Sequence, residues 1–134
     1  MTARLTVRIL IAAAVLVSAY VHLKLWLDTM RHVHIIGPAF MVNVVAGVVI
    51  AGLLVAWRHW LAPLLAAGFG ASTLGALTLA STVDLFGYHE PWQGPYVWTS
   101  AVVEAFAIVT GLYAVSRERR SAPARARQHS PVAG

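Results

Sequence analysis

Four long apolar segments follow one another along this chain and take up most of its length. They comprise residues 5–27, 38–57, 61–86 and 95–116. A helix needs about 20 predominantly apolar residues to cross the hydrocarbon core of a bilayer. Lipid offers no hydrogen-bond partner to the backbone, so such segments cross as helices. Because the connections between them are short, neighbouring helices should run antiparallel. The sequence therefore predicts an all-α membrane bundle of four transmembrane helices.

The composition also indicates that lipid surrounds the chain, in which residues 1–116 are predicted to form one transmembrane domain. The chain has 134 residues, of which 59% are hydrophobic and only 11% are charged. Soluble domains carry about 25% charged residues. The chain contains no cysteine, which excludes disulfides, thiolate metal sites and cysteine nucleophiles.

Basic residues are distributed unevenly between the two ends of the predicted bundle. Lys24 and Arg31 fall on one side. The other side has Arg4, Arg8, Arg58, Arg117, Arg119, Arg120, Arg125 and Arg127. Since basic residues near helix ends stay in the cytoplasm, both termini are predicted to be cytoplasmic. Residues 117–134 contain Pro and Ser but no apolar periodicity, which predicts a disordered basic tail that attracts anionic lipid and binds no nucleic acid.

The first apolar segment also has features of a cleavable signal peptide. Arg4 and Arg8 precede an apolar core, and Val17-Ser18-Ala19 resembles a cleavage site. The apolar run continues to Leu27, however, which is long enough to cross the bilayer. We therefore expect the first helix to be retained.

A weak repeat relates the two halves of the chain. Gly37-Pro38 aligns with Gly94-Pro95, 57 positions later, and each pair precedes a predicted return helix. Proline in the first helical turn loses no needed hydrogen bond, so the pattern is chemically sensible. It predicts two repeated hairpins of the same orientation, although chance similarity in so apolar a chain remains an alternative.

A few polar residues interrupt the apolar segments near their predicted outer ends. Glu104 lies about 13 Å into the fourth helix at 1.5 Å per residue, where a carboxyl group has to be protonated or paired. His22, Asn43 and Asp84 should reach a similar depth, with Asp84 in the last turn of the third helix. We predict a polar cluster of these four side chains in which Glu104 pairs with His22.

His89 and Glu90 belong to the outer loop that should cover this cluster. The predicted ligand-binding residues are thus His22, Asn43, Asp84, His89, Glu90 and Glu104. Imidazole and carboxylate groups serve metal sites, proton relays and anion or quinone pockets, and they also form purely structural networks. No HExxH zinc motif, Walker loop, glycine-rich dinucleotide turn or GxSxG elbow is present, so no catalytic residue is predicted.

Three segments carry a resemblance to known sequences: YVHLKLW at 20–26, HIIGPAFMVNVVAG at 34–47 and FGYHEPW at 86–92. They resemble small four-span integral membrane proteins of GC-rich bacteria, and the layout is similar to that of the DoxX-like group. The resemblance implies the four-helix fold and a bacterial inner-membrane location, and it transfers no catalytic residue.

These observations favour a non-enzymatic accessory or small-ligand-binding component of a bacterial envelope complex. Its partners would be the bilayer and other membrane subunits or further copies of the chain. The alternative is a small transporter or membrane redox component that uses the polar cluster for protons, a metal ion or a quinone. No cofactor is required by the sequence, and a transporter would need polar groups in the inner leaflet as well, where the sequence offers few.

Overall fold

The chain forms a bundle of four long helices, as the sequence predicts. The computed structural model describes residues 2–128, with side chains described as far as Ser121. Its helices are α1 (Ala3–Asp28), α2 (Ile36–Ala56), α3 (Leu61–Thr82) and α4 (Pro95–Gln128), with a 3₁₀ turn η1 at Met30–His32. All four helices are long and apolar enough to cross a membrane, which fits a multi-pass integral membrane protein.

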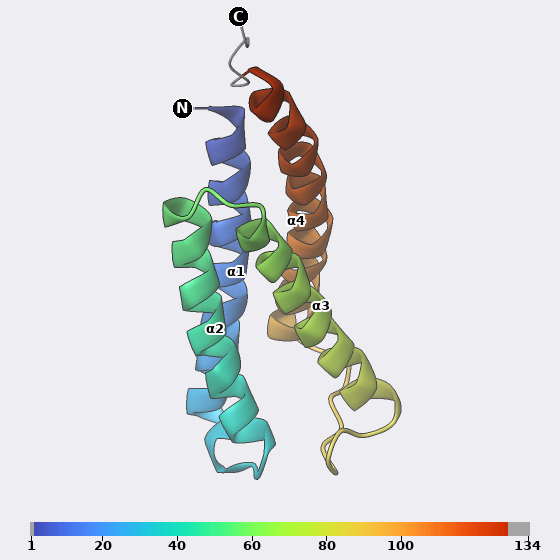
Figure 1. Cartoon of the computed structure of the whole chain (residues 1–134). Helices are drawn as coiled ribbons and strands as arrows, with labels where there is room; N and C mark the ends of the chain where they lie inside the picture. Colours follow the sequence, from blue (N-terminus) through green and yellow to red (C-terminus); the bar gives the residue numbers. More distant parts are fainter. Residues whose placement is uncertain (1, 129–134) are drawn as a thin grey trace, which may run out of the picture.

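The helices alternate in direction, so α1 starts and α4 finishes at the same end of the bundle (Figure 1). We call this end the terminal end and the opposite end, where α1 joins α2 and α3 joins α4, the loop end. The two hairpins α1–α2 and α3–α4 are the most closely packed helix pairs. Helices α2 and α3 lie close at the terminal end and diverge toward the loop end (Figure 1).

Several helix boundaries differ from the predicted spans. Helix α2 begins at Ile36, so Pro38 lies inside its first turn, where proline is still tolerated. Helix α3 ends at Thr82, because Val83 with a φ of −130° and Asp84 with a φ of 54° both lie outside the right-handed helical region. Asp84 therefore lies in the loop, and its predicted place in the last helical turn is wrong.

The fourth helix continues past Ser116 into the segment predicted to be a disordered tail. It runs to Gln128, through residues rich in Arg and Ala. These residue types have high helix propensity, which outweighs the lack of an apolar face. The remainder of the predicted tail, residues 129–134, lies outside the described residues.

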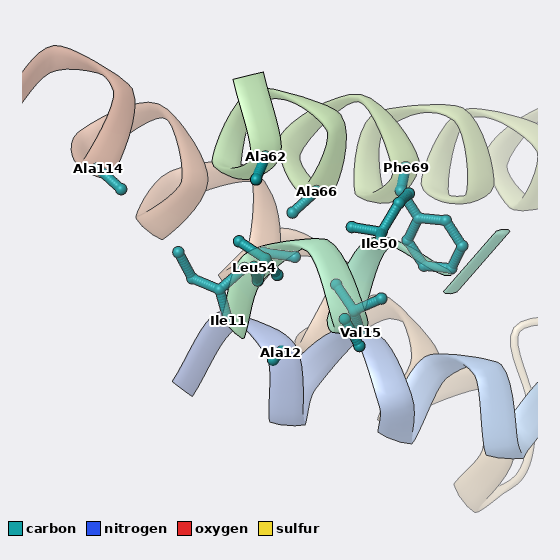
Figure 2. Close-up of a cluster of buried hydrophobic side chains, with 11 residues drawn as sticks. Ile11, Ala12, Val15, Ile50, Leu54, Ala62, Ala66, Phe69 and Ala114 are labelled. Atoms are coloured by element: carbon teal, nitrogen blue, oxygen red, sulfur yellow. The ribbon is translucent and has the colours of Figure 1, made fainter. Parts of the chain in front are cut away.

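The apolar core fills the terminal half of the bundle (Figure 2). Its centre is Ile11 and Leu54, neither of which has any exposed surface. Small residues of α3 and α4, including Ala62, Ala66 and Ala107, bring the hairpins together. Phe69 lies at the loop-end limit of this core, where the divergence of α2 and α3 begins.

Glycine sets the separation of α3 and α4 at two points. A Cβ atom on Gly70 would lie 2.6 Å from the backbone oxygen of Glu104, and one on Gly111 would lie 2.8 Å from the backbone oxygen of Pro63. A side chain at either position would force the two backbones apart. Gly68 and Gly75 have no neighbour within 4 Å of such an atom, so neither is a point of close contact with another helix.

Large apolar side chains cover the outside of the bundle. On α2 the exposed valines are Val42, Val45, Val48, Val49 and Val55, and comparable residues cover α4. An apolar exterior of this kind is stable only where lipid is the surrounding solvent. The protein interior, by contrast, contains four buried polar or charged side chains among the described residues: Arg8, Ser18, Ser100 and Glu104.

Candidate ligand-binding pocket

Glu104 is the most deeply buried acidic residue of the loop-end half, with 1% of its surface exposed. Two serine hydroxyls donate to its Oε1 atom. Ser100, one turn earlier on α4, donates at 2.6 Å, and Ser18 of α1 donates at 2.9 Å. Ser100, Glu104, Ala107 and Gly111 recur along one face of α4 and are all buried, so this face is directed into the bundle.

His22 lies one helical turn from Ser18 on α1 and is bound to it rather than to Glu104. Its Nδ1 atom lies 2.8 Å from the backbone oxygen of Ser18, and the Ser18 hydroxyl lies 3.5 Å from the same nitrogen. A carbonyl oxygen can only accept, so Nδ1 carries the hydrogen. The predicted direct pair of Glu104 and His22 is therefore replaced by a chain in which Ser18 stands between them.

A pocket of about 320 Å³ lies in the loop-end half of the bundle, where α2 and α3 diverge. Phe69 closes it toward the core, and all four helices and the α3–α4 loop contribute polar side chains to its lining. We call it the loop-end pocket. Most of its surface is apolar, and the lining residues are His22, Leu25, Ile36, Ala39, Phe40, Val42, Asn43, Ala46, Phe69, Ser72, Thr73, Ala76, Leu77, Ala80, Leu85, Tyr88, Glu90, Val97, Ser100 and Glu104.

The mouth of the loop-end pocket faces sideways, between α2 and α3. Ala39 and Val42 line it from α2, and Ser72 and Ala76 line it from α3; all four are exposed. These residues lie within the two helices that could cross a membrane. The mouth therefore opens toward lipid and gives apolar molecules a route into the pocket.

Two buried oxygen atoms in the pocket have no hydrogen-bond partner among the described residues. They are Oε2 of Glu104 and Oδ1 of Asn43. Both side chains line the loop-end pocket. A buried polar atom without a partner costs about 1–3 kcal/mol, so a binding group that satisfies both oxygens would recover a large free energy.

Tyr88 and Glu90 form the rim of the pocket at the loop end. The Tyr88 hydroxyl donates to Oε2 of Glu90, and both residues line the cavity. Partial burial, and then this hydrogen bond to a carboxylate, raise the pKa of Tyr88 well above its ordinary value. The phenol therefore stays protonated and fixes the Glu90 side chain at the rim.

Asp84 and His89 do not belong to the pocket. The His89 Nδ1 atom lies 2.7 Å from Oδ1 of Asp84, and both side chains are more than half exposed. Of the six predicted ligand-binding residues, the structure thus brings together His22, Asn43, Glu90 and Glu104 and leaves this pair outside. Within residues 2–128, no group of three His or acidic residues is arranged to hold a metal ion.

A second buried polar cluster, which the sequence analysis does not predict, lies at the terminal end. Arg8 is only 5% exposed, and its guanidinium binds both carboxylate oxygens of Glu118 at 2.7 and 2.8 Å. It also donates to the backbone oxygens of Leu54, Trp57 and His59. Arg8 thereby ties the α2–α3 connection to α1 and α4, in addition to its predicted role as a charge that orients the chain.

The sequence contains a signal that could have identified Arg8 and Ser18. Arg8, Ile11, Val15, Ser18 and His22 recur at intervals of three and four residues, which places them on one face of α1. The structure shows this face directed into the bundle.

Comparison of the chain with protein-family models, with curated proteins and with solved structures finds no significant match.

Proposed function

We propose that this protein binds a small lipid-soluble molecule in the loop-end pocket and acts as a non-enzymatic membrane component. One observation carries the proposal: a mostly apolar pocket of about 320 Å³ contains two buried oxygen atoms without partners among the described residues. Pockets for small molecules have this composition, with apolar walls and a few polar groups that fix the orientation of the ligand.

The volume and position of the pocket suit a compact ligand that arrives through the bilayer. Small-molecule pockets span roughly 300–1,000 Å³, and this one lies at the lower limit of that range. A molecule dissolved in lipid could enter between α2 and α3 without crossing water. The polar group of the ligand would then meet Glu104 and Asn43 at the inner wall.

The packing of the terminal half argues against the alternative of a transporter. Beyond Glu104, the inward face of α4 continues with Ala107, Gly111 and Ala114, all of them buried against the apolar core. A path for ions or protons would need polar groups along this stretch. The buried ion pair at the terminal end joins Arg8 and Glu118, so these two side chains already satisfy one another.

A ligand that occupies the pocket should accompany the protein during purification. We expect mass spectrometry of small molecules extracted from the mildly solubilised protein to detect an enriched lipid-soluble compound. Ala76→Phe should abolish the enrichment, because the new ring would fill the mouth of the pocket. Ala105→Phe is the matched control, since Ala105 is also exposed on a helix but does not line the pocket. Equal enrichment in wild type and both variants would contradict the proposal.

We further propose that the loop end faces away from the cytoplasm of a bacterial cell, as the distribution of basic residues indicates. The chain has no cysteine, so cysteines introduced singly at Arg31, Arg58, Gln93 and Gln128 give clean reporters. An impermeant thiol reagent added to intact cells should label positions 31 and 93 only. Labelling at position 58 or 128 would reverse the proposed orientation.

A further inference from the structure

We propose that the ligand of the loop-end pocket is a lipid-soluble amine in its protonated form. Its ammonium group would bind Oε2 of Glu104 and Oδ1 of Asn43, and its carbon body would extend between α2 and α3. This inference rests on the proposed function and adds the chemical class of the ligand.

The two buried atoms of the pocket that have no partner among the described residues are both oxygens. Asn43 Oδ1 can only accept, and an ionised Glu104 leaves Oε2 as a second acceptor. A ligand that satisfies acceptors has to donate, and an ammonium group has up to three N–H donors and no acceptor.

The charges around the pocket also favour a cation. Its acidic lining residues are Glu104 and Glu90, and among the described lining residues none is Lys or Arg. The two serine hydroxyls on Oε1 are neutral, so they leave the charge of an ionised Glu104 uncompensated. A buried carboxylate is costly unless a cation pairs with it. An anionic ligand would add a second negative charge at the same depth and should be excluded.

The apolar lining suits the rest of such a molecule. Phe40, Phe69 and Tyr88 line the pocket, and aromatic ring faces attract ammonium groups as well as carbon. The small side chains Ala39 and Ala76 leave the mouth open toward lipid. An amine with a single ring or a short chain fits this volume and can partition into the bilayer before it binds.

Three probes with the same phenyl-alkyl body separate the possible head groups. They are 4-phenylbutylamine, 4-phenylbutan-2-one and 4-phenylbutanoate, and binding to the purified full-length protein at neutral pH is measured by calorimetry. We expect the amine to bind, the ketone to bind at least ten times more weakly and the carboxylate not to bind. The ketone, which only accepts hydrogen bonds, represents the quinone class.

Two variants test the predicted head-group contacts. Glu104→Gln keeps an oxygen acceptor for Ser18 and Ser100 but removes the charge, so the dissociation constant of the amine should rise at least about tenfold. Asn43→Leu removes an acceptor that has no partner among the described residues, so it should leave the fold intact and weaken amine binding several-fold. Circular dichroism and the thermal midpoint establish that each variant is folded.

The outcomes distinguish this inference from the proposed function. Ketone binding as tight as amine binding, or amine binding that neither variant weakens, would overturn the amine as the ligand class. If Ala76→Phe still abolished binding of the probes in that case, the pocket would remain a binding site for a different class of ligand. If no probe binds, the amine is excluded, and the compound that accompanies the purified protein decides the proposed function independently.

Discussion

Replacing Arg8 by leucine is expected to destabilise the folded protein by about 3–5 kcal/mol, the cost of removing one partner from a buried ion pair. The substitution would leave Glu118 without its cation. It would also leave the backbone oxygens of Leu54 in α2 and of Trp57 and His59 in the α2–α3 connection without their donor. Thermal or denaturant unfolding in detergent measures the loss. Arg8→Lys should recover only part of it, because an ammonium cannot reproduce the two parallel bonds to the Glu118 carboxylate.

Arg4→Leu is the matched control for this substitution. Arg4 also carries a positive charge at the terminal end, but its side chain is exposed and makes no hydrogen bond to another described residue. Loss of this charge should change the free energy of unfolding by less than about 0.5 kcal/mol. Equal effects of Arg8→Leu and Arg4→Leu would show that Arg8 contributes only its charge and that the buried cluster does not hold the bundle together.

Alanine at Gly70 or Gly111 should be the next most damaging substitution. A new Cβ atom would meet a backbone oxygen of the partner helix at 2.6 or 2.8 Å, so α3 and α4 would have to separate. Overpacking of this kind costs about 1–3 kcal/mol. At Gly70 the displaced backbone is that of Glu104, so Gly70→Ala should also weaken ligand binding in the loop-end pocket.

Gly68 and Gly75 provide controls on the same helix. A Cβ atom added at either position would have no neighbour within 4 Å, so alanine has room at both. Alanine favours a helix over glycine by about 1 kcal/mol, so both controls should be neutral or stabilising. Unfolding measurements that find all four substitutions alike would contradict the close approach of α3 and α4.

The number and order of the helices could be predicted because membrane spans depend on local properties of the sequence. Segment length, apolar composition and short connections are enough to define α1 to α4. The depth of Glu104 could also be calculated from its distance to Pro95 along the helix. Helix ends were harder to predict, because composition does not specify the backbone angles at a helix end. The positive φ of Asp84, for example, is not evident from the sequence.

The partners of the polar residues could not be predicted, because they depend on how the helices are rotated and how closely they pack. Ser18 and His22 are one turn apart, and a small rotation of α1 decides which of them reaches Glu104. From its position near the start of the first helix, Arg8 is expected to be an exposed charge that orients the chain. In the structure its side chain is instead buried, where it donates to carbonyl groups of the α2–α3 connection. The divergence of α2 and α3, which creates the loop-end pocket, could not be predicted from the sequence of either helix.

Chemical modification of Glu104 from the lipid phase tests most directly whether the loop-end pocket opens to the bilayer and exposes the free oxygen of this residue. Carbodiimides add to protonated carboxyl groups, and dicyclohexylcarbodiimide dissolves in lipid. After treatment of membranes at mildly acidic pH, peptide mass spectrometry should find the adduct on Glu104 but not on Glu118, whose two oxygens are bound to Arg8. Ala76→Phe should prevent the reaction, because the new ring would fill the mouth of the pocket. An unmodified Glu104 in the wild type, or equal modification in Ala76→Phe, would contradict a pocket that opens between α2 and α3.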